Sequence, residues 1–457
     1  MKLFDGAPTV SKVGDYAVLC LFMLLVSAVW VESDIYRYAA VILVVWGLAD
    51  YWRAEFKPSI SWMGYICIAW VAFVAIRYIF AYLDPSVQSH GTSEGIYLFP
   101  ILYMTVGYMM FRYRHMHEKA AVLFVMISFV MSAATLQPSS LFEDGHQDVH
   151  YDFLMMKNTI HSSVGAGFII LAAINFAGFA IKNVRNTRRR LCYEAIAYAT
   201  VGLCIIGLYG AKAKGVWLAI AAALCAQVLL SARRTYGKRG WIIAGAFLVA
   251  LTAFVATFST GIWATIGPTY QSAIEIAVAT LESGSPAGAI QSAIASGTVP
   301  TSMNERLMLW SNAVEVWSHN IVFGNGIAWK DLWAKSQYQN VGFDLIHNGY
   351  LEVSVRYGLV GLFFYTVLYC WSITMSYRAS NRGLIPSEAF NLHVVSLVFF
   401  LATILTNSNN RLAIGETYMM VSAAVGFYGY YLCQYHARSG KDEARQDLAS
   451  AAHLRQP

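Results

Sequence analysis

The chain has 457 residues, of which 57% are hydrophobic and 13% are charged. Soluble domains usually carry about 25% charged residues, so this chain has too little polar surface to cover its apolar residues in water. The composition excludes disordered, collagen-like and nucleic-acid-binding proteins and indicates a polytopic membrane protein. The net charge of +6 does not identify a partner, because in a membrane protein the distribution of Lys and Arg matters more than their sum.

Long apolar runs follow one another along most of the chain. A membrane-spanning helix needs about 20 mostly apolar residues, and about twelve segments meet this criterion. We therefore expect an all-α fold in which residues 1–457 form a single polytopic membrane domain. The predicted spans lie near residues 16–32, 38–52, 60–80, 95–112, 119–136, 159–181, 192–210, 215–231, 241–261, 352–376, 389–406 and 417–434.

Basic residues gather in every second connection between these spans, for example in residues 182–190 and 233–239. The positive-inside rule predicts that these connections are cytoplasmic, together with both termini and the polar tail 435–457. The opposite face, which is periplasmic in a bacterium, then holds one long segment, residues 262–351. Segments of this length usually carry function. Within it, residues 283–302 are rich in Gly, Ala, Ser and Pro, which predicts a mobile or loosely helical stretch.

Several common motifs are missing from the sequence. It contains no GxxxxGK[ST] loop for nucleotide phosphates, no HExxH, no GxSxG and no CxxC pair. No two aspartates have DxD spacing, so a metal-chelated nucleotide sugar is not the expected substrate. The clear ionisable residue within a predicted span is Arg77, near the outer end of its helix, whereas transporters place such residues in mid-span.

The run HNGYLEVSVRYGLVG at residues 347–361 directly follows the long segment. If it is helical from its start, His347, Leu351, Ser354, Gly358 and Gly361 lie on one stripe. The small residues of this stripe would let another helix approach closely. An imidazole at the membrane interface can act as a general base near neutral pH. The alternative is an interfacial or helix-capping histidine.

Charged residues on either side of this stripe have simpler expected roles. Arg356 lies on the opposite side of the helix from His347, so we expect it to pair with Glu352, four residues before it. Asp344 is placed to orient His347, but an N-cap role for this aspartate is favoured.

The run also resembles the signature of the bacterial O-antigen ligase family, H-[NSQ]-x9-G-x2-[GTY]. His347, Asn348, Gly358 and Gly361 fill its four defined positions. The resemblance covers roughly residues 200–430.

Two further elements of that family are present upstream of the histidine. One is an Arg four residues before a Trp, followed by Gly-x-Gly; the other is a Ser/Thr-Arg-Gly-x-Trp-Leu run at the outer start of a helix. The corresponding residues are Arg306, Trp310, Gly324, Gly326 and the run AKGVWL at 213–218. Lys214 stands where Arg is common in the family, which keeps the positive charge but loses the bidentate fork.

The resemblance implies a membrane-embedded glycosyltransferase of the GT-C type, in the inner membrane of a Gram-negative bacterium. Such an enzyme is metal-independent and inverting, needs no cofactor, and moves a polysaccharide from undecaprenyl pyrophosphate to lipid A–core on the periplasmic side. His347 would then be the catalytic base that takes the proton of the acceptor hydroxyl.

A pyrophosphate leaving group needs fixed cations to hold it, and four basic residues are predicted at the outer face. They are Arg306, Lys214, Lys212 and Arg411, and each has an alternative role. Arg306 could form a salt bridge with Glu305 or Glu315, and Lys214 could be a helix-end lysine that snorkels. The Lys212 side chain could face elsewhere on its helix, and Arg411 could anchor the last outer loop.

An acidic and histidine-rich cluster in another outer connection has alternating residues that would gather ligands if the segment were extended. We expect no metal site there, since acidic outer loops commonly follow the charge rule. The cluster consists of Glu143, Asp144, His146, Asp148, His150 and Asp152.

The sequence leaves three functions open. The leading one is the O-antigen ligase. An O-antigen polymerase or a protein O-oligosaccharyltransferase of the same superfamily would share the donor and differ in the acceptor. A membrane transporter or lipid flippase is the remote alternative, because charged residues in mid-span and internal repeats are missing.

Overall fold

A computed structural model describes residues 12–88, 92–137, 153–232, 245, 259–342 and 345–453. All regular structure in these ranges is helical, with no strand. Seven helical segments within them are long and apolar enough to cross a membrane, and Ser387–Thr403 is a shorter apolar helix. The protein is therefore an all-α polytopic membrane protein, as its composition predicts.

The helices follow the predicted spans closely in most of the chain. Before the long segment they are α1 (Lys12–Leu25), α2 (Ile35–Arg53), α3 (Trp62–Leu83), α4 (Pro100–Arg112), α5 (His117–Thr135), α6 (Thr159–Asn183), α7 (Thr187–Gly210) and α8 (Lys214–Ser231). The later helices are α10 (Ser259–Ser283), α11 (Pro286–Ser296), α12 (Thr301–Ser318), α13 (Trp329–Trp333), α14 (Gly349–Asn381), α15 (Ser387–Thr403) and α16 (Ala413–His453).

Three predicted spans need comment. The span near 16–32 overlaps the candidate membrane span Lys12–Val29, within which α1 ends at Leu25 and a 3-10 turn follows at Ser27–Val29. The span near 95–112 is likewise divided: a 3-10 helix, η2 (Thr92–Leu98), precedes α4, which starts at Pro100 because proline is favoured in the first helical turn. Most of the span near 241–261 lies outside the described residues.

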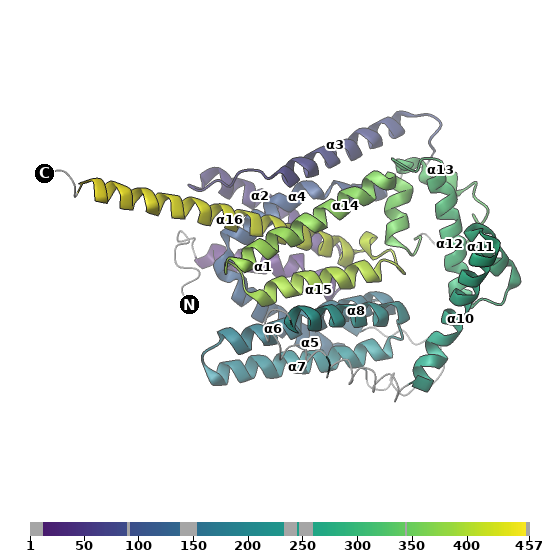
Figure 1. The fold of residues 1–457 in the computed structure, drawn as a ribbon, viewed down its shortest axis with the longest axis horizontal. Coiled ribbons are helices and arrows are strands. Elements are labelled where there is room, and N and C mark those ends of the chain that lie inside the picture. The colour runs from purple at the N-terminus through teal and green to yellow at the C-terminus, as the bar shows by residue number, and fades with distance from the viewer. Residues whose placement is uncertain are drawn as a thin grey trace.

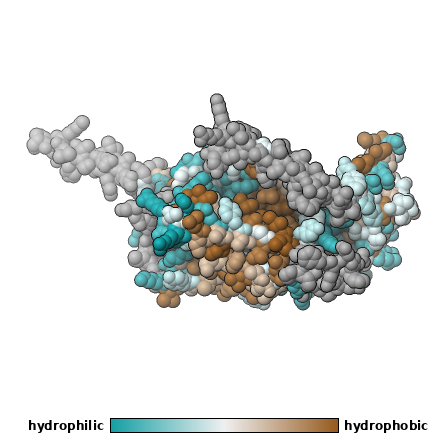
Figure 2. All heavy atoms as spheres, turned by 90° about the horizontal axis from the view of Figure 1, so that it is seen from below, coloured by the Kyte–Doolittle hydropathy of each residue, from teal (hydrophilic) through white to brown (hydrophobic). Residues whose placement is uncertain are grey.

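The helices form an elongated bundle with a separate group of helices at one end (Figure 1). Helices α10, α11, α12 and α13 gather at this end, whereas the C-terminal half of α16 leaves the bundle at the other. The long segment is thus largely helical, and α11 occupies part of the Gly/Ala/Ser/Pro-rich stretch. In Figure 2 hydrophobic side chains cover the middle of one face, and more hydrophilic residues lie toward both ends.

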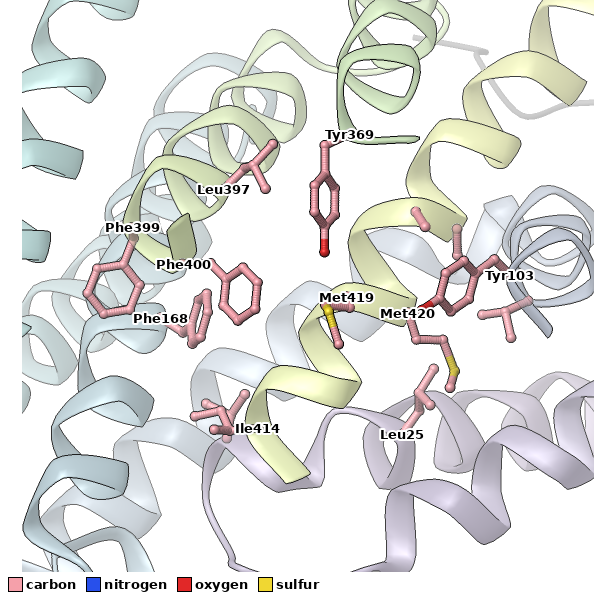
Figure 3. Packing of buried hydrophobic residues seen from close by; sticks show 14 of the residues in the cluster. Leu25, Tyr103, Phe168, Tyr369, Leu397, Phe399, Phe400, Ile414, Met419 and Met420 are labelled. Carbon is pink, nitrogen blue, oxygen red and sulfur yellow. The ribbon is translucent and has the colours of Figure 1, made fainter. Parts of the chain in front are cut away.

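Close packing around α16 holds the centre of the bundle together (Figure 3). Between helices in a membrane the packing depends on van der Waals contact, which small residues allow. Gly107 of α4 is such a residue, since a Cβ there would lie 2.5 Å from Cβ of Phe427 and 2.7 Å from the carbonyl oxygen of Ala424. Met420 and Phe427 are fully buried in this cluster.

Helix α14 is broken at Gly358, where the backbone adopts φ 59° and ψ −151°. Segment 321–325 docks at the break: the two N–H groups after Gly358 donate to the carbonyls of Ile321 and Val322, at 3.0 Å each. The N–H of Asn325 donates to the carbonyl of Val355 at 2.8 Å. The predicted small-residue stripe therefore does not run along one straight helix. Instead, Gly358 lets the backbone of segment 321–325 contact the backbone of α14.

The Gly-x-Gly element completes this junction from the loop side. Gly324 has φ 66°, and its backbone lies so close to that of Arg356 that no side chain fits between them. Arg77 of α3 donates to the carbonyl of Gly324 at 2.8 Å and to that of Phe323. Arg77 thus holds the loop against α14.

We predict that Gly358→Ala destabilises the protein more than Gly383→Ala does. Both glycines have positive φ, but the region around Gly358 is essentially restricted to glycine and its neighbours crowd the added Cβ, whereas nothing lies within 4 Å of Gly383. The control substitution should cost about 1–2 kcal/mol. Thermal unfolding in detergent measures both, and equal losses would mean that the docked loop is not tightly held.

Candidate functional site

His347 lies in the turn before α14, outside the helix. Asn348 is the N-cap, and its Oδ1 accepts hydrogen bonds from the N–H groups of Tyr350 and Leu351 at 3.0 and 3.1 Å. The predicted helical stripe starting at His347 is therefore wrong, and Asp344, predicted as a cap, lies outside the described residues. The helix starts two residues later because the Asn348 side chain satisfies its first free N–H groups.

The backbone of His347 is in the left-handed region, with φ 54°. A residue other than glycine held there costs on the order of 1–3 kcal/mol, and such residues cluster at functional sites. Hydrogen bonds on both sides hold it: the N–H of Ile346 donates to Oε1 of Glu352 at 2.9 Å, and the N–H of Gly349 donates to the carbonyl of Ile404 at 2.7 Å. The Asn348 amide adds a bond to a neighbouring carbonyl, that of Leu405, at 3.1 Å.

Helix α12 brings Arg306 to this turn. Its apolar residues Ala313 and Val316 pack with Ile346 and Val355 in one buried cluster, so α12 lies against the start of α14. Arg306 is partly buried and forms no ion pair with a described residue, which argues against the predicted alternative of a salt bridge. Burial lowers the pKa of Arg306, and the nearby charge of Glu305 acts in the opposite direction. A guanidinium beside a histidine is suited to an anionic ligand.

The imidazole of His347 is affected by its burial and by this cation. Burial lowers its pKa below the usual 6.5, and the charge of Arg306 lowers the pKa further. A hydrogen bond to Asn407 and the carboxylates of Glu352 and Glu305 act in the opposite direction and raise it. The net shift is downward, so the imidazole is mostly neutral at pH 7 and can accept a proton.

The two lysines lie at the N-terminal end of α8, close to the same loop. Gly215 packs against Thr406 so closely that a Cβ would meet its hydroxyl, and Thr406 directly precedes the residue that bonds His347. Lys214, the first residue of α8, and Lys212 are both exposed, and neither forms an ion pair with a described residue. The structure therefore brings both lysines to the corner of the bundle that holds His347.

Arg411 belongs to a buried network of alternating charges. Its Nη1 lies 3.3 Å from Oε2 of Glu352, which also lies 2.5 Å from Nη1 of Arg356. Nε of Arg356 lies 3.0 Å from Oε1 of Glu94, and Tyr357 donates to the other oxygen of Glu94 at 2.6 Å. The predicted Glu352–Arg356 pair is thus present. The position of Arg411 supports its role as a loop anchor, and contact with pyrophosphate stays a prediction.

The acidic and histidine-rich cluster lies outside the described residues. Within the described ranges, no group of three or more His, Cys, Asp or Glu side chains is placed to hold a metal ion.

Residues 199–366 match the family model described as O-antigen ligase. Over these residues, which make up less than half of the chain, the protein is similar to the O-antigen ligase family. The matched segment runs from the second half of α7 to the middle of α14, and contains the lysines of α8, Arg306 and the histidine signature. Arg411 lies beyond it. No curated protein matches the chain.

Sequence reasoning missed three parts of this site. Glu94 carried no signal except that it is acidic within an apolar run, and the contacts of Asn407 and Arg77 depend on segments distant in sequence. The Glu352–Arg356 pair could be predicted because residues four apart are neighbours on a helix.

We predict that Arg356→Ala lowers the free energy of unfolding by about 3–5 kcal/mol, because it leaves two buried carboxylates without their shared partner. The matched control is Arg189→Ala, which breaks a pair with Glu118 in which both side chains are about half exposed. That change should cost at most about 1 kcal/mol. Unfolding curves in detergent compare the two, and similar costs would argue against a buried network.

Proposed function

We propose that the protein is an O-antigen ligase, which transfers a polysaccharide from undecaprenyl pyrophosphate to lipid A–core without a metal ion or cofactor. His347 takes the proton of an acceptor sugar hydroxyl. The hydroxyl oxygen attacks the anomeric carbon of the donor from the side opposite the pyrophosphate. The bond from this carbon to the pyrophosphate oxygen breaks, its electron pair leaves with the pyrophosphate, and the centre is inverted.

The observation that carries this proposal is a guanidinium beside an imidazole whose pKa is lowered. Arg306 lies close enough to His347 to lower its pKa, yet forms no ion pair with a described residue. Base and cation are the two groups that the reaction needs, one for the attacking hydroxyl and one for the charge that develops on the leaving group.

Lys214 and Lys212 supply further positive charge, since they stand at the start of α8 beside the loop that bonds His347. We assign Arg306 and Lys214 the main contacts with the pyrophosphate. Lys212 and Arg411 have supporting roles, because the charge of Arg411 is already shared with Glu352.

The arrangement of the helices suits a reaction at a membrane surface. The site lies where the long helical segment meets the bundle, so a lipid-linked donor held in the membrane can present its pyrophosphate there. We propose about twelve spans, with both termini cytoplasmic and this end of the bundle facing the periplasm of a Gram-negative bacterium.

Deletion of the gene should leave lipopolysaccharide with core but without O-antigen, and wild type but not His347→Ala should restore the ladder. The reason is that the substitution removes the imidazole that we propose takes the proton of the attacking hydroxyl. Gel profiling of lipopolysaccharide measures the outcome, and the His347→Ala protein must reach wild-type levels in the membrane.

Two outcomes would contradict the ligase. A ladder restored by His347→Ala removes the proposed base. Lipopolysaccharide with a single O-antigen unit in the deletion strain indicates a polymerase, and an unaltered ladder with loss of glycan from periplasmic proteins indicates a protein oligosaccharyltransferase.

Arg306→Gln should raise KM for the lipid-linked donor and move the acid limb of the pH–rate profile to higher pH. The cation lowers the pKa of His347, so removing it raises that pKa, and more of the imidazole is protonated at low pH. Lys214→Gln should weaken donor use with a smaller effect on the acid limb of the pH–rate profile. The control is Lys335→Gln, at an exposed residue just after α13. Unchanged donor dependence in both variants would remove the pyrophosphate site.

A further inference from the structure

We propose that Glu352 is the positioning residue of this site: it holds His347 in its left-handed turn and sets the electrostatic environment of the imidazole. The inference rests on the proposed function of His347 as base. Glu352 does not touch a substrate in this scheme, and it acts through its neighbours.

The two oxygens of Glu352 have separate partners. Oε1 accepts from the N–H of Ile346 at 2.9 Å and from the hydroxyl of Ser408 at 3.0 Å. Ile346 directly precedes His347, and Ser408 directly follows Asn407, whose side chain bonds the imidazole. Oε1 of Glu352 therefore holds both the residue before His347 and the residue after Asn407, the hydrogen-bond partner of His347.

The other oxygen, Oε2, is held by two cations. Arg356 lies at 2.5 Å and Arg411 at 3.3 Å, and the carboxylate is fully buried. Arg356 is in turn held by Glu94 and stacks over Trp329 at 4.4 Å. These contacts come from four separate elements, so the carboxylate cannot shift without breaking several charged hydrogen bonds.

Four donors reach Glu352, and none of its contacts is an acceptor. A glutamine there must turn its NH₂ group either toward the Ile346 N–H and Ser408 or toward the two guanidinium groups. Aspartate keeps the charge but is one methylene shorter, so it cannot reach both sets of partners at once. Glutamine thus tests the effect of losing the negative charge, and aspartate tests the effect of shortening the side chain.

Three charged groups act directly on His347, and further cations stand on neighbouring segments. Arg306 and Glu305 come from α12, Glu352 from α14, and Arg411 from the loop after α15, while Lys212 and Lys214 stand at the start of α8. The arginine of α12 lowers the pKa of His347, and both carboxylates raise it. Losing the charge of Glu352 should therefore lower this pKa.

The experiment compares Glu352→Gln, Glu352→Asp and Ser408→Ala with wild type in purified, full-length protein. One readout is transfer of lipid-linked polysaccharide to lipid A–core. The other is the rate at which diethyl pyrocarbonate modifies His347 as a function of pH, followed by mass spectrometry, because the reagent attacks the neutral imidazole. The second readout needs no catalytic activity.

We expect Glu352→Asp to lower kcat about 100-fold through displacement of His347 by an ångström or so, with KM for the donor unchanged. Glu352→Gln should lower kcat and also move the modification profile of His347 to lower pH. Ser408→Ala should give a smaller fall in kcat. The matched control is Glu388→Gln, which removes another buried carboxylate, one paired with Lys182 at 2.5 Å, and it should leave both readouts unchanged.

Folded Glu352 variants with wild-type kcat and modification profile would overturn the inference. If these variants do not fold, Ser408→Ala decides: a fall in kcat at constant KM supports the role, and an unchanged kcat refutes it. Wild type without transfer activity would instead refute the proposed function, and a shifted modification profile in Glu352→Gln would still show that the carboxylate controls His347.

Discussion

The carboxylate of Glu352 is the interaction on which the region around the histidine depends. It is fully buried and joins α14 to the turn before it, to the loop after α15 and, through Arg356, to the 3-10 helix that carries Glu94. Two carboxylates and two guanidinium groups alternate in this network, so their charges balance. A single buried charge here would be costly, and only the alternation allows so many ionised groups below the surface.

The second constraint is backbone contact between α14 and the long segment. Gly358 and Gly324 let the two chains approach without side chains between them, and Arg77 closes the junction from α3. Helix α12 is attached to the same junction through its apolar face, and this fixes where Arg306 stands relative to His347. The glycines of the signature thus determine the position of the catalytic candidates, although they carry no chemistry themselves.

The charges around His347 are distributed unequally, and this has a chemical consequence. Arg411 and Arg356 are neutralised by carboxylates, whereas Arg306, Lys212 and Lys214 form no ion pair with a described residue. Some of the positive charge near His347 is therefore paired with carboxylates, and some has no ion pair within the part of the chain that the structure describes. Such asymmetry suits a reaction in which an anion leaves on one side while a hydroxyl gives up its proton.

The sequence by itself determined the fold class, because long apolar runs with few charges can be stable only as helices in a membrane. Local motifs also made His347, Arg306 and Lys214 candidates, which stay predictions, and helical spacing predicted the Glu352–Arg356 pair, which is present. The sequence could not show that α14 breaks at Gly358 or that His347 precedes the helix, because a loop distant in sequence supplies the hydrogen bonds that stabilise the break. The partners of Glu94 and Arg411 were decided by tertiary structure for the same reason. The groups that pair with a buried charge come from segments that are distant in sequence.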